Sequence, residues 1–306
     1  METPAVSVML VVRNGAATLP LALRSIAAQT DPRWELLAYD DGSSDDTTEI
    51  LEHWASADPR IRLFRSSESQ GLGARLNELV HEARAPLIAR MDADDVAYPD
   101  RLRRQIEFLE THPDVDLVGA SLAVFRDNGS LCGKRAAPPT QDEIVGVPFR
   151  AFRIFHPTWM GRAEWFRRHP YKVGAVRSQD QELLYRALPG STYANVTDVL
   201  LGYREERISL SRNTRARWQM SWRVAVLAVR RGRPDHALLN ALAHLAKAVL
   251  DVIAVATGAR HRLLRQRAGR IASRATRQLI CHRARVLRDR EMRSSRYPSS
   301  TSVTFA

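Results

Sequence analysis

The sequence predicts an α/β fold, with a mostly parallel, doubly wound sheet flanked by helices. Val6–Val12 is a valine-rich, largely apolar run, which is typical of a strand that is covered on both faces. Strand-like and helix-like segments then alternate through the first 125 residues, and this alternation is typical of parallel sheets. Ligands of such sheets bind beyond the carboxyl ends of the strands. We therefore expect the functional residues in the loops that follow strands.

The helix signals support each step of this alternation. Thr18 is expected to cap a helix that carries Pro20 in its first turn, and Ser44 or Asp45 is expected to cap the next helix. Gly71 and Gly73 mark the turn before a third helix. The expected strands are 6–12, 34–39, 61–64, 86–91 and 115–125, and the expected helices are 18–29, 45–57, 73–83 and 99–112.

The charge divides the chain into two parts. Residues 211–306 hold 21 basic and 4 acidic residues, a net charge of +17, and subtracting them from the whole chain leaves 25 basic and 30 acidic residues in 1–210, a net charge of −5. We therefore expect a folded domain over 1–210 and a basic, mainly helical extension over 211–306 with a frayed end. Such an extension suits an anionic membrane surface, or it packs on the domain as a helical hairpin. Nucleic acid is disfavoured, because no nucleic-acid-binding motif is present.

A helix is expected from Trp218 to Ala256. One narrow polar stripe runs along it, formed by His236, Asn240, His244, Lys247 and Asp251. These polar groups argue against a transmembrane span. The two cysteines do not suggest a disulfide framework, and no basic segment precedes the first strand, so we expect a cytoplasmic protein, peripheral on the inner face of the membrane if the extension binds lipid.

Acidic residues follow the second expected strand, in the run 40–47. A helix cap explains Ser44 and Asp45, because acidic and hydroxyl side chains stabilise a helix N-terminus. Capping does not explain Asp40 and Asp41 at the strand end, where like charges repel. Their carboxylates can accept hydrogen bonds from a nucleobase and from ribose hydroxyls. Both interpretations stay open on spacing alone.

Three carboxylates follow the fourth expected strand, at Asp92, Asp94 and Asp95. They repel one another unless a positive charge lies among them. A hard divalent cation binds such oxygen ligands and usually keeps substrate phosphate oxygens in its shell. The alternative is a solvated acidic turn. The position at a strand end favours a metal site.

Four motifs in order resemble those of the family 2 glycosyltransferases, which are inverting enzymes with the GT-A fold. These motifs are the strand 6–12 with the loop that follows it, the acidic loop 40–47, the segment 71–77, and 91–95 with 99–102. The resemblance covers about residues 5–210. It implies transfer of a sugar from a UDP-, dTDP- or GDP-linked donor to a glycan or lipid-linked acceptor in surface polysaccharide or glycolipid synthesis.

The resemblance also implies roles on the donor side. Asp40 and Asp41 would hold the base and ribose, and Arg75 would lie near the nucleotide. Residues 92–94 would be the DXD motif, with Asp94 as the metal ligand and Asp92 nearer the ribose. The implied cofactor is Mn²⁺ or Mg²⁺.

Inverting transfer needs a base that removes the proton of the acceptor hydroxyl. Asp180 matches the family position of this base, but Gln179 stands where the family usually has Glu. His156 matches an acceptor-side strand, and Arg204 could meet the diphosphate, because guanidinium groups bind phosphate well. Ordinary structural roles remain open for all four residues.

Other functions are less well supported. A nucleotidyltransferase would share a carboxylate–metal site, and a dehydrogenase would share the sheet, but the loop after the first strand has one glycine where either would carry a glycine-rich loop. A non-catalytic protein that binds sugar nucleotides or glycans is the remaining alternative. Asp94 and Asp180 argue against it.

Overall fold

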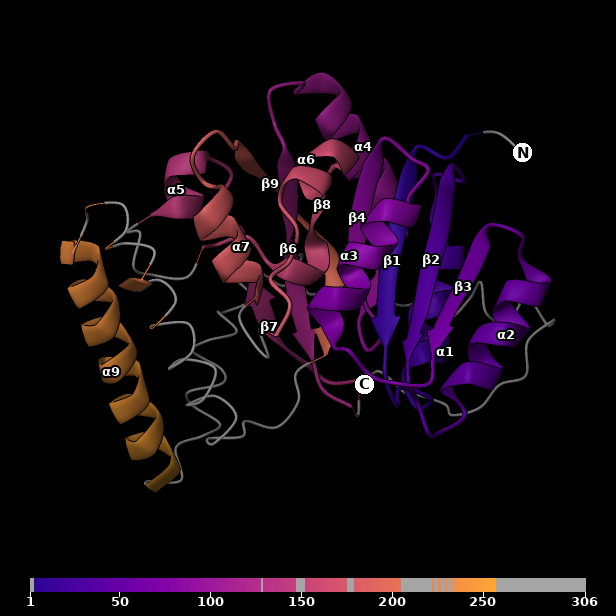
Figure 1. Ribbon diagram of the computed structural model, residues 1–306, viewed down its shortest axis with the longest axis horizontal. Coiled ribbons are helices and arrows are strands. Elements are labelled where there is room, and N and C mark those ends of the chain that lie inside the picture. The colour runs from indigo at the N-terminus through magenta and orange to yellow at the C-terminus, as the bar shows by residue number, and fades with distance from the viewer. Residues whose placement is uncertain are drawn as a thin grey trace.

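A computed structural model describes residues 3–127, 129–146, 152–174, 179–204 and 234–256, together with positions 222, 225, 226, 229 and 232. Nine strands form one sheet in the order β3-β2-β1-β4-β8-β6-β9-β5, and β7 pairs with β6 (Figure 1). The strands are β1 (Val6–Val12), β2 (Trp34–Asp41), β3 (Ile61–Ser66), β4 (Leu87–Asp92), β5 (Val96–Ala97), β6 (Leu117–Phe125), β7 (Leu131–Arg135), β8 (Met160–Arg162) and β9 (Tyr193–Arg204).

The first four expected strands are confirmed as a parallel unit. β1 lies between β2 and β4, and β3 pairs with the outer edge of β2. The carboxyl ends of β2 and β4 therefore lie on the same edge of the sheet, on either side of β1. This arrangement brings the two acidic loops of the sequence to one edge, as predicted.

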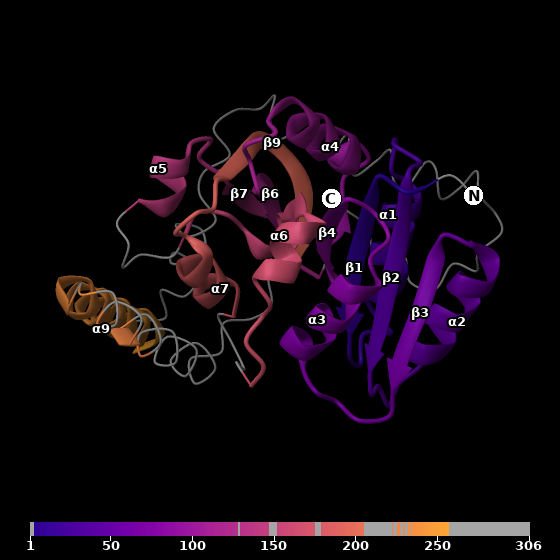
Figure 2. The same cartoon turned by 45° about the horizontal axis from the view of Figure 1, so that its top comes forward.

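Helices cover both faces of the sheet, which confirms the doubly wound arrangement (Figure 2). Buried residues of α1 (Leu19–Ala27), α2 (Thr47–Ala57) and α4 (Arg101–Thr111) join one core cluster. Buried residues of α3 (Leu72–Glu82), α5 (Gln141–Val145), α6 (Ala163–Arg168) and α7 (Gln179–Ala187) join a second cluster. Alternate residues of β1 point into the two clusters, with Leu10 in the first and Met9 in the second.

Two of the predicted helix caps differ in the structure. The residue at the N-cap position of α2 is Asp46, one residue after the expected Asp45, although Asp45 still accepts a hydrogen bond from the backbone N–H of Thr47. Thr18 holds the predicted N-cap position of α1, but its hydroxyl donates to the carbonyl of Gly15 and does not cap the helix.

The second half of the sheet is mixed rather than wholly parallel. β8 pairs antiparallel with β4 and with β6, while β9 pairs parallel with β6 and antiparallel with β5. A short helix, η1 (His156–Thr158), immediately precedes β8. The expected strand 115–125 therefore exists as β6, but β8 separates it from β4.

The C-terminal part is described only in places. The helix α9 (Pro234–Ala256) lies beyond α5 and α7 in both views (Figures 1 and 2). The expected continuous helix 218–256 is wrong at Gly232, which lies in a turn with φ of +69°, a conformation that favours glycine. The start of that helix at Trp218, the domain boundary at 210 and the frayed end lie outside the described residues.

Candidate functional site

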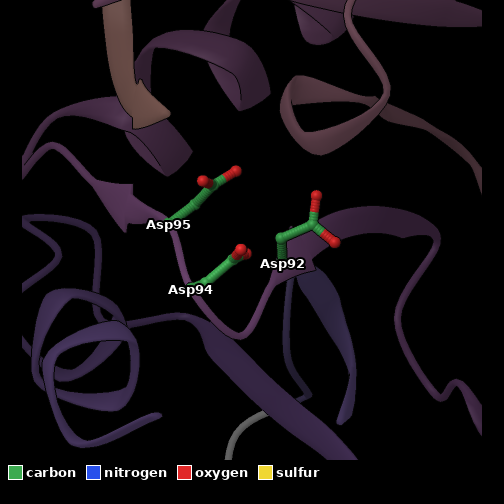
Figure 3. Close-up of side chains that lie close together, drawn as sticks. All are labelled: Asp92, Asp94 and Asp95. Carbon is green, nitrogen blue, oxygen red and sulfur yellow. The ribbon is translucent and has the colours of Figure 1, made fainter. Parts of the chain in front are cut away.

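The carboxylates predicted to bind a metal lie on one turn at the end of β4. Asp92 is the last residue of β4, and the backbone N–H of Asp95 donates to the carbonyl of Asp92, which closes the turn. One oxygen from each of Asp92, Asp94 and Asp95 can be chosen so that all three lie within 4.8 Å of one another. Their side chains project from the turn into a common space (Figure 3).

Asp95 is the buried member of this group. One of its carboxylate oxygens accepts a hydrogen bond from the backbone N–H of Arg204 at 2.9 Å, and the other has no hydrogen-bond partner among the described residues. Burial, together with the charges of Asp92 and Asp94, raises the pKa of Asp95 well above its ordinary value. A divalent cation at this turn would stabilise the ionised carboxylates and would therefore lower the pKa of Asp95 again. The hard oxygen donors and the unpartnered oxygen therefore fit Mg²⁺ or Mn²⁺.

Arg204, at the end of β9, is fixed against the same turn. Its Nε donates to the carbonyl of Asp94 at 2.9 Å, and its Nη1 pairs with the exposed Asp127 at 3.1 Å. Its guanidinium also lies over the ring of Phe125. The structure thus brings Arg204 to the carboxylate turn, and a guanidinium in such a position can bind phosphate oxygens.

Asp41 and Arg75 form a buried ion pair beside the carboxyl end of β2. Arg75 Nε donates to Asp41 at 2.7 Å, and the same carboxylate accepts hydrogen bonds from the backbone of Gln70 and Gly71 and from the hydroxyl of Ser69. Burial raises the pKa of Asp41, but the hydrogen bonds outweigh this effect and the pKa is lowered. Asp41 is therefore an ionised anchor for the loop 66–71.

Arg75 also contacts an aromatic ring and two further polar groups beside this ion pair. Its guanidinium is 4.6 Å from the ring centre of Tyr39 and donates to Glu78 and to the carbonyl of Glu68. Asp40, the neighbour of Asp41, accepts hydrogen bonds from the backbone and hydroxyl of Ser43 and from Thr48. The two aspartates thus shape different loops, which the sequence alone did not indicate.

Asp180 lies in the first turn of α7 and is partly buried. Burial raises the pKa of its carboxyl, and a hydrogen bond from the Gln181 side chain at 3.2 Å opposes the rise. A carboxylate with a raised pKa is a stronger base. Gln179 is buried one residue earlier, and its Oε1 would lie 2.8 Å from a Cβ added at Gly73. The glycine therefore allows α3 and the start of α7 to approach each other closely.

His156 begins η1 and pairs with a buried tyrosine. Its Nε2 lies 2.9 Å from the hydroxyl of Tyr171, and its ring contacts Trp159 edge to face. Burial, and after it the charge of Arg90, lowers the pKa of His156 well below its ordinary value. His156 is therefore neutral near pH 7, and one of its ring nitrogens can accept a hydrogen bond.

Comparison with known families assigns the N-terminal half of the chain. The model of the family "Glycosyl transferase family 2" matches residues 7–169, which is more than half of the chain. The chain belongs to this family. The match includes β1, both acidic loops and His156, and it ends before Asp180 and Arg204.

Curated relatives of this family 2 chain carry related names. The chain is 28% identical over 221 residues to the O-antigen biosynthesis glycosyltransferase WbnJ of Escherichia coli, covering 70% of this chain and 85% of WbnJ. It is 29% identical to the amylovoran biosynthesis glycosyltransferase AmsE of Erwinia amylovora, covering 61% of this chain and 70% of AmsE. It is 34% identical to EpsE of Bacillus subtilis over 54% of this chain, but spans only 58% of the length of EpsE.

Solved structures share the fold. The mannosyltransferase PcManGT of Pyrobaculum calidifontis, in complex with GDP-Man and Mn²⁺, matches with a TM-score of 0.58 at 19% identity, over 96% of this chain and 88% of PcManGT. TarS of S. aureus in complex with UDP-GlcNAc matches with a TM-score of 0.57 at 17% identity, over 72% of this chain and 65% of TarS. These matches confirm the predicted GT-A fold. Among the described residues, no helix is both long enough and apolar enough to cross a bilayer.

One residue beside the carboxylate turn was given no role in the sequence analysis. Arg90 lies on β4, two positions before Asp92, and forms an ion pair with it. Its charge also acts on His156, Tyr171 and Asp180. Its backbone N–H donates to the carbonyl of Trp159, whose ring contacts His156, so Arg90 lies between the carboxylate turn and the predicted acceptor side. The signal was present in the sequence, since Arg90 is the one charged residue that interrupts the otherwise apolar run 86–91.

Proposed function

We propose that this chain transfers a sugar from a nucleoside-diphosphate donor to an acceptor hydroxyl, with inversion at the anomeric carbon and with the help of a divalent cation. The arrangement of carboxylates supports this proposal most directly. Three of them share one turn at the end of β4, and Asp180 stands apart from them on α7. Such a division suits a displacement, because the leaving group and the attacking hydroxyl need help on opposite sides of the sugar.

In this proposal, the N-terminal half of the domain holds the nucleotide. Asp41 and Arg75 order the loop 66–71 and a surface beside Tyr39 for the base, and Asp40 orders the loop after β2. Asp92 would reach the ribose. Arg204, held to the turn through Asp94, supplies positive charge next to the diphosphate.

Asp94 would hold Mn²⁺ or Mg²⁺ with help from its neighbours, and the bound ion would stabilise the negative charge that develops on the departing nucleotide. Asp180 would accept the proton of the attacking hydroxyl. Its raised pKa suits this role, provided that the pH stays above it. Gln179 and the neutral His156 would contact the acceptor.

The names of WbnJ and AmsE suggest that the acceptor is a growing glycan of a surface polysaccharide or glycolipid. Such acceptors are often lipid-linked, and the +17 charge of residues 211–306 suits an anionic membrane surface. The large apolar residues exposed on α9 add a surface that could enter the interface: Leu238, Leu239, Leu242, Leu245, Val249, Leu250 and Ile253. We therefore place the protein in the cytoplasm, at the inner face of the membrane.

A thermal-shift screen tests the donor part of the proposal. UDP, dTDP, GDP and their common sugar conjugates are added with Mn²⁺, because a ligand that binds only the folded state raises the melting temperature. The proposal predicts a shift for one nucleotide class and consumption of the matching nucleotide-sugar. Binding without consumption in the presence of glycan and lipid acceptors would favour the non-catalytic alternative. Release of pyrophosphate from a nucleoside triphosphate would favour a nucleotidyltransferase.

A further inference from the structure

Arg90 is a buried cation whose hydrogen bonds are incomplete. Its side chain is 3% exposed, and it forms an ion pair with Asp92. Its Nε has no hydrogen-bond partner among the described residues. Leaving a charged donor unpaired in the interior is costly, so natural proteins rarely do so without a reason. An absent ligand is one such reason.

The backbone fixes the direction of this side chain. The N–H of Arg90 donates to the carbonyl of Trp159 at 2.9 Å, and its carbonyl accepts from Nη2 of Arg101 at 2.6 Å. Arg101 is itself buried and belongs to α4. β4 is thus held at Arg90 from both sides, and the Arg90 side chain leaves the strand on the same face as Asp92, since two positions separate them.

The neighbours of Arg90 come from both halves of the proposed site. Asp92 belongs to the carboxylate turn on the donor side. His156 and Tyr171, whose Nε2 and hydroxyl are 2.9 Å apart, belong to the acceptor side. They are joined to Arg90 through Trp159, whose carbonyl accepts a hydrogen bond from the backbone N–H of Arg90 and whose ring contacts His156. The Arg90 charge also acts on Asp180. In an inverting displacement the transferred sugar must lie between these two groups of residues.

We propose that Arg90 contacts the transferred sugar itself, donating from Nε to a hydroxyl or ring oxygen of the donor sugar. This inference rests on the proposed function. Asp92 offsets the charge of Arg90, so that the residue offers directed N–H donors rather than a free positive charge. That distinction matters, because an unbalanced cation beside the anomeric carbon would oppose the positive charge that develops there. Sugar hydroxyls, by contrast, accept such donors well. Arg90 would then be a specificity-determining residue.

The test compares the affinities of a nucleoside diphosphate and of its sugar conjugate by calorimetry. The probes are UDP with UDP-GlcNAc and GDP with GDP-mannose, all with Mn²⁺, measured on the full-length chain. Arg90→Met should weaken binding of the nucleotide-sugar about 10- to 100-fold, the range expected for a hydrogen bond from a charged donor. It should leave the affinity for the nucleoside diphosphate unchanged.

Two further variants keep the result interpretable. Arg90→Lys keeps a cation beside Asp92, which protects the fold, but removes the directed Nε–H, so the same selective loss is expected. Arg104→Met removes an exposed guanidinium of α4 that pairs with Asp198, and it should change neither affinity. Equal losses for the diphosphate and the conjugate in both Arg90 variants would overturn the inference, because Arg90 would then act through the nucleotide. No loss for either ligand would overturn it as well. A wild-type chain that binds neither these probes nor dTDP and its sugar conjugates would remove the proposed function, and this inference with it.

Discussion

Replacing the proposed base gives the sharpest test of the chemistry. Asp180→Asn keeps the size of the side chain and an oxygen that can accept the hydrogen bond from Gln181, but it removes the basicity. General base catalysis contributes about 10²- to 10⁴-fold in rate, or roughly 3–5 kcal/mol of barrier. The kcat of the variant should fall by about that factor, while donor affinity stays the same, because the nucleotide is proposed to bind beside β2 and β4.

The stability of the same variant follows from the sign of the pKa shift. Burial raises the pKa of Asp180, so the folded state favours the protonated form, and at neutral pH the ionised carboxylate costs stability. Asparagine removes that cost, and the melting temperature should stay equal or rise. Steady-state kinetics, calorimetry with the donor and thermal melts provide the measurements. Asp142→Asn is the control, since Asp142 lies in the first turn of α5 and is exposed. A variant with near-wild-type kcat would refute the assignment of the base.

Three more predictions follow from the structure. Asp180 can act as a base only when it is ionised, and burial raises its pKa. The logarithm of kcat/KM should therefore fall with a slope of one against pH as the pH drops below that pKa. A flat profile at acidic pH would contradict this. Gly119→Ala should lower the free energy of unfolding by about 1–3 kcal/mol, since the added methyl would lie 2.4 Å from Oδ1 of Asn195 and 2.6 Å from Cγ1 of Ile154; an unchanged melting temperature would refute it. The full-length chain should sediment with anionic vesicles but not with neutral ones, and added salt should release it because salt screens the charges. Binding that is the same for anionic and neutral vesicles and unchanged by salt would exclude an electrostatic membrane contact.

The parallel half of the fold was predictable because its signals are local and strong. Each of the first four strands is a short segment rich in apolar residues, and helices with recognisable start signals separate these segments. The other half carries weaker signals. β5 has two residues and β8 has three, and their pairing depends on distant partners that no local pattern specifies. The position of β8 between β4 and β6 is one example, because it depends on pairing with strands that are distant in the sequence.

The site was predictable where several like charges gather at a strand end. Asp92, Asp94 and Asp95 were recognised on this ground, and the structure brings their carboxylates together. The use of Asp41 as an anchor for the loop 66–71 was not predictable, because its donors lie 28 to 34 residues away along the chain. Arg90 stands out in the sequence as a charge within an apolar run, but its position between the carboxylate turn and the acceptor side appears only when β4 and η1 are assembled.

The central claim is that the carboxylate turn serves a metal-dependent transfer. Consumption of the nucleotide-sugar by the wild type is measured with Mn²⁺ or Mg²⁺ and in excess chelator, beside Asp94→Asn and the control Asp114→Asn, which changes an exposed carboxylate. We predict that the chelator abolishes turnover by the wild type and that added metal restores it. Asp94→Asn should remain folded but inactive, and Asp114→Asn should behave like the wild type. Undiminished turnover by metal-free wild-type protein would contradict the account.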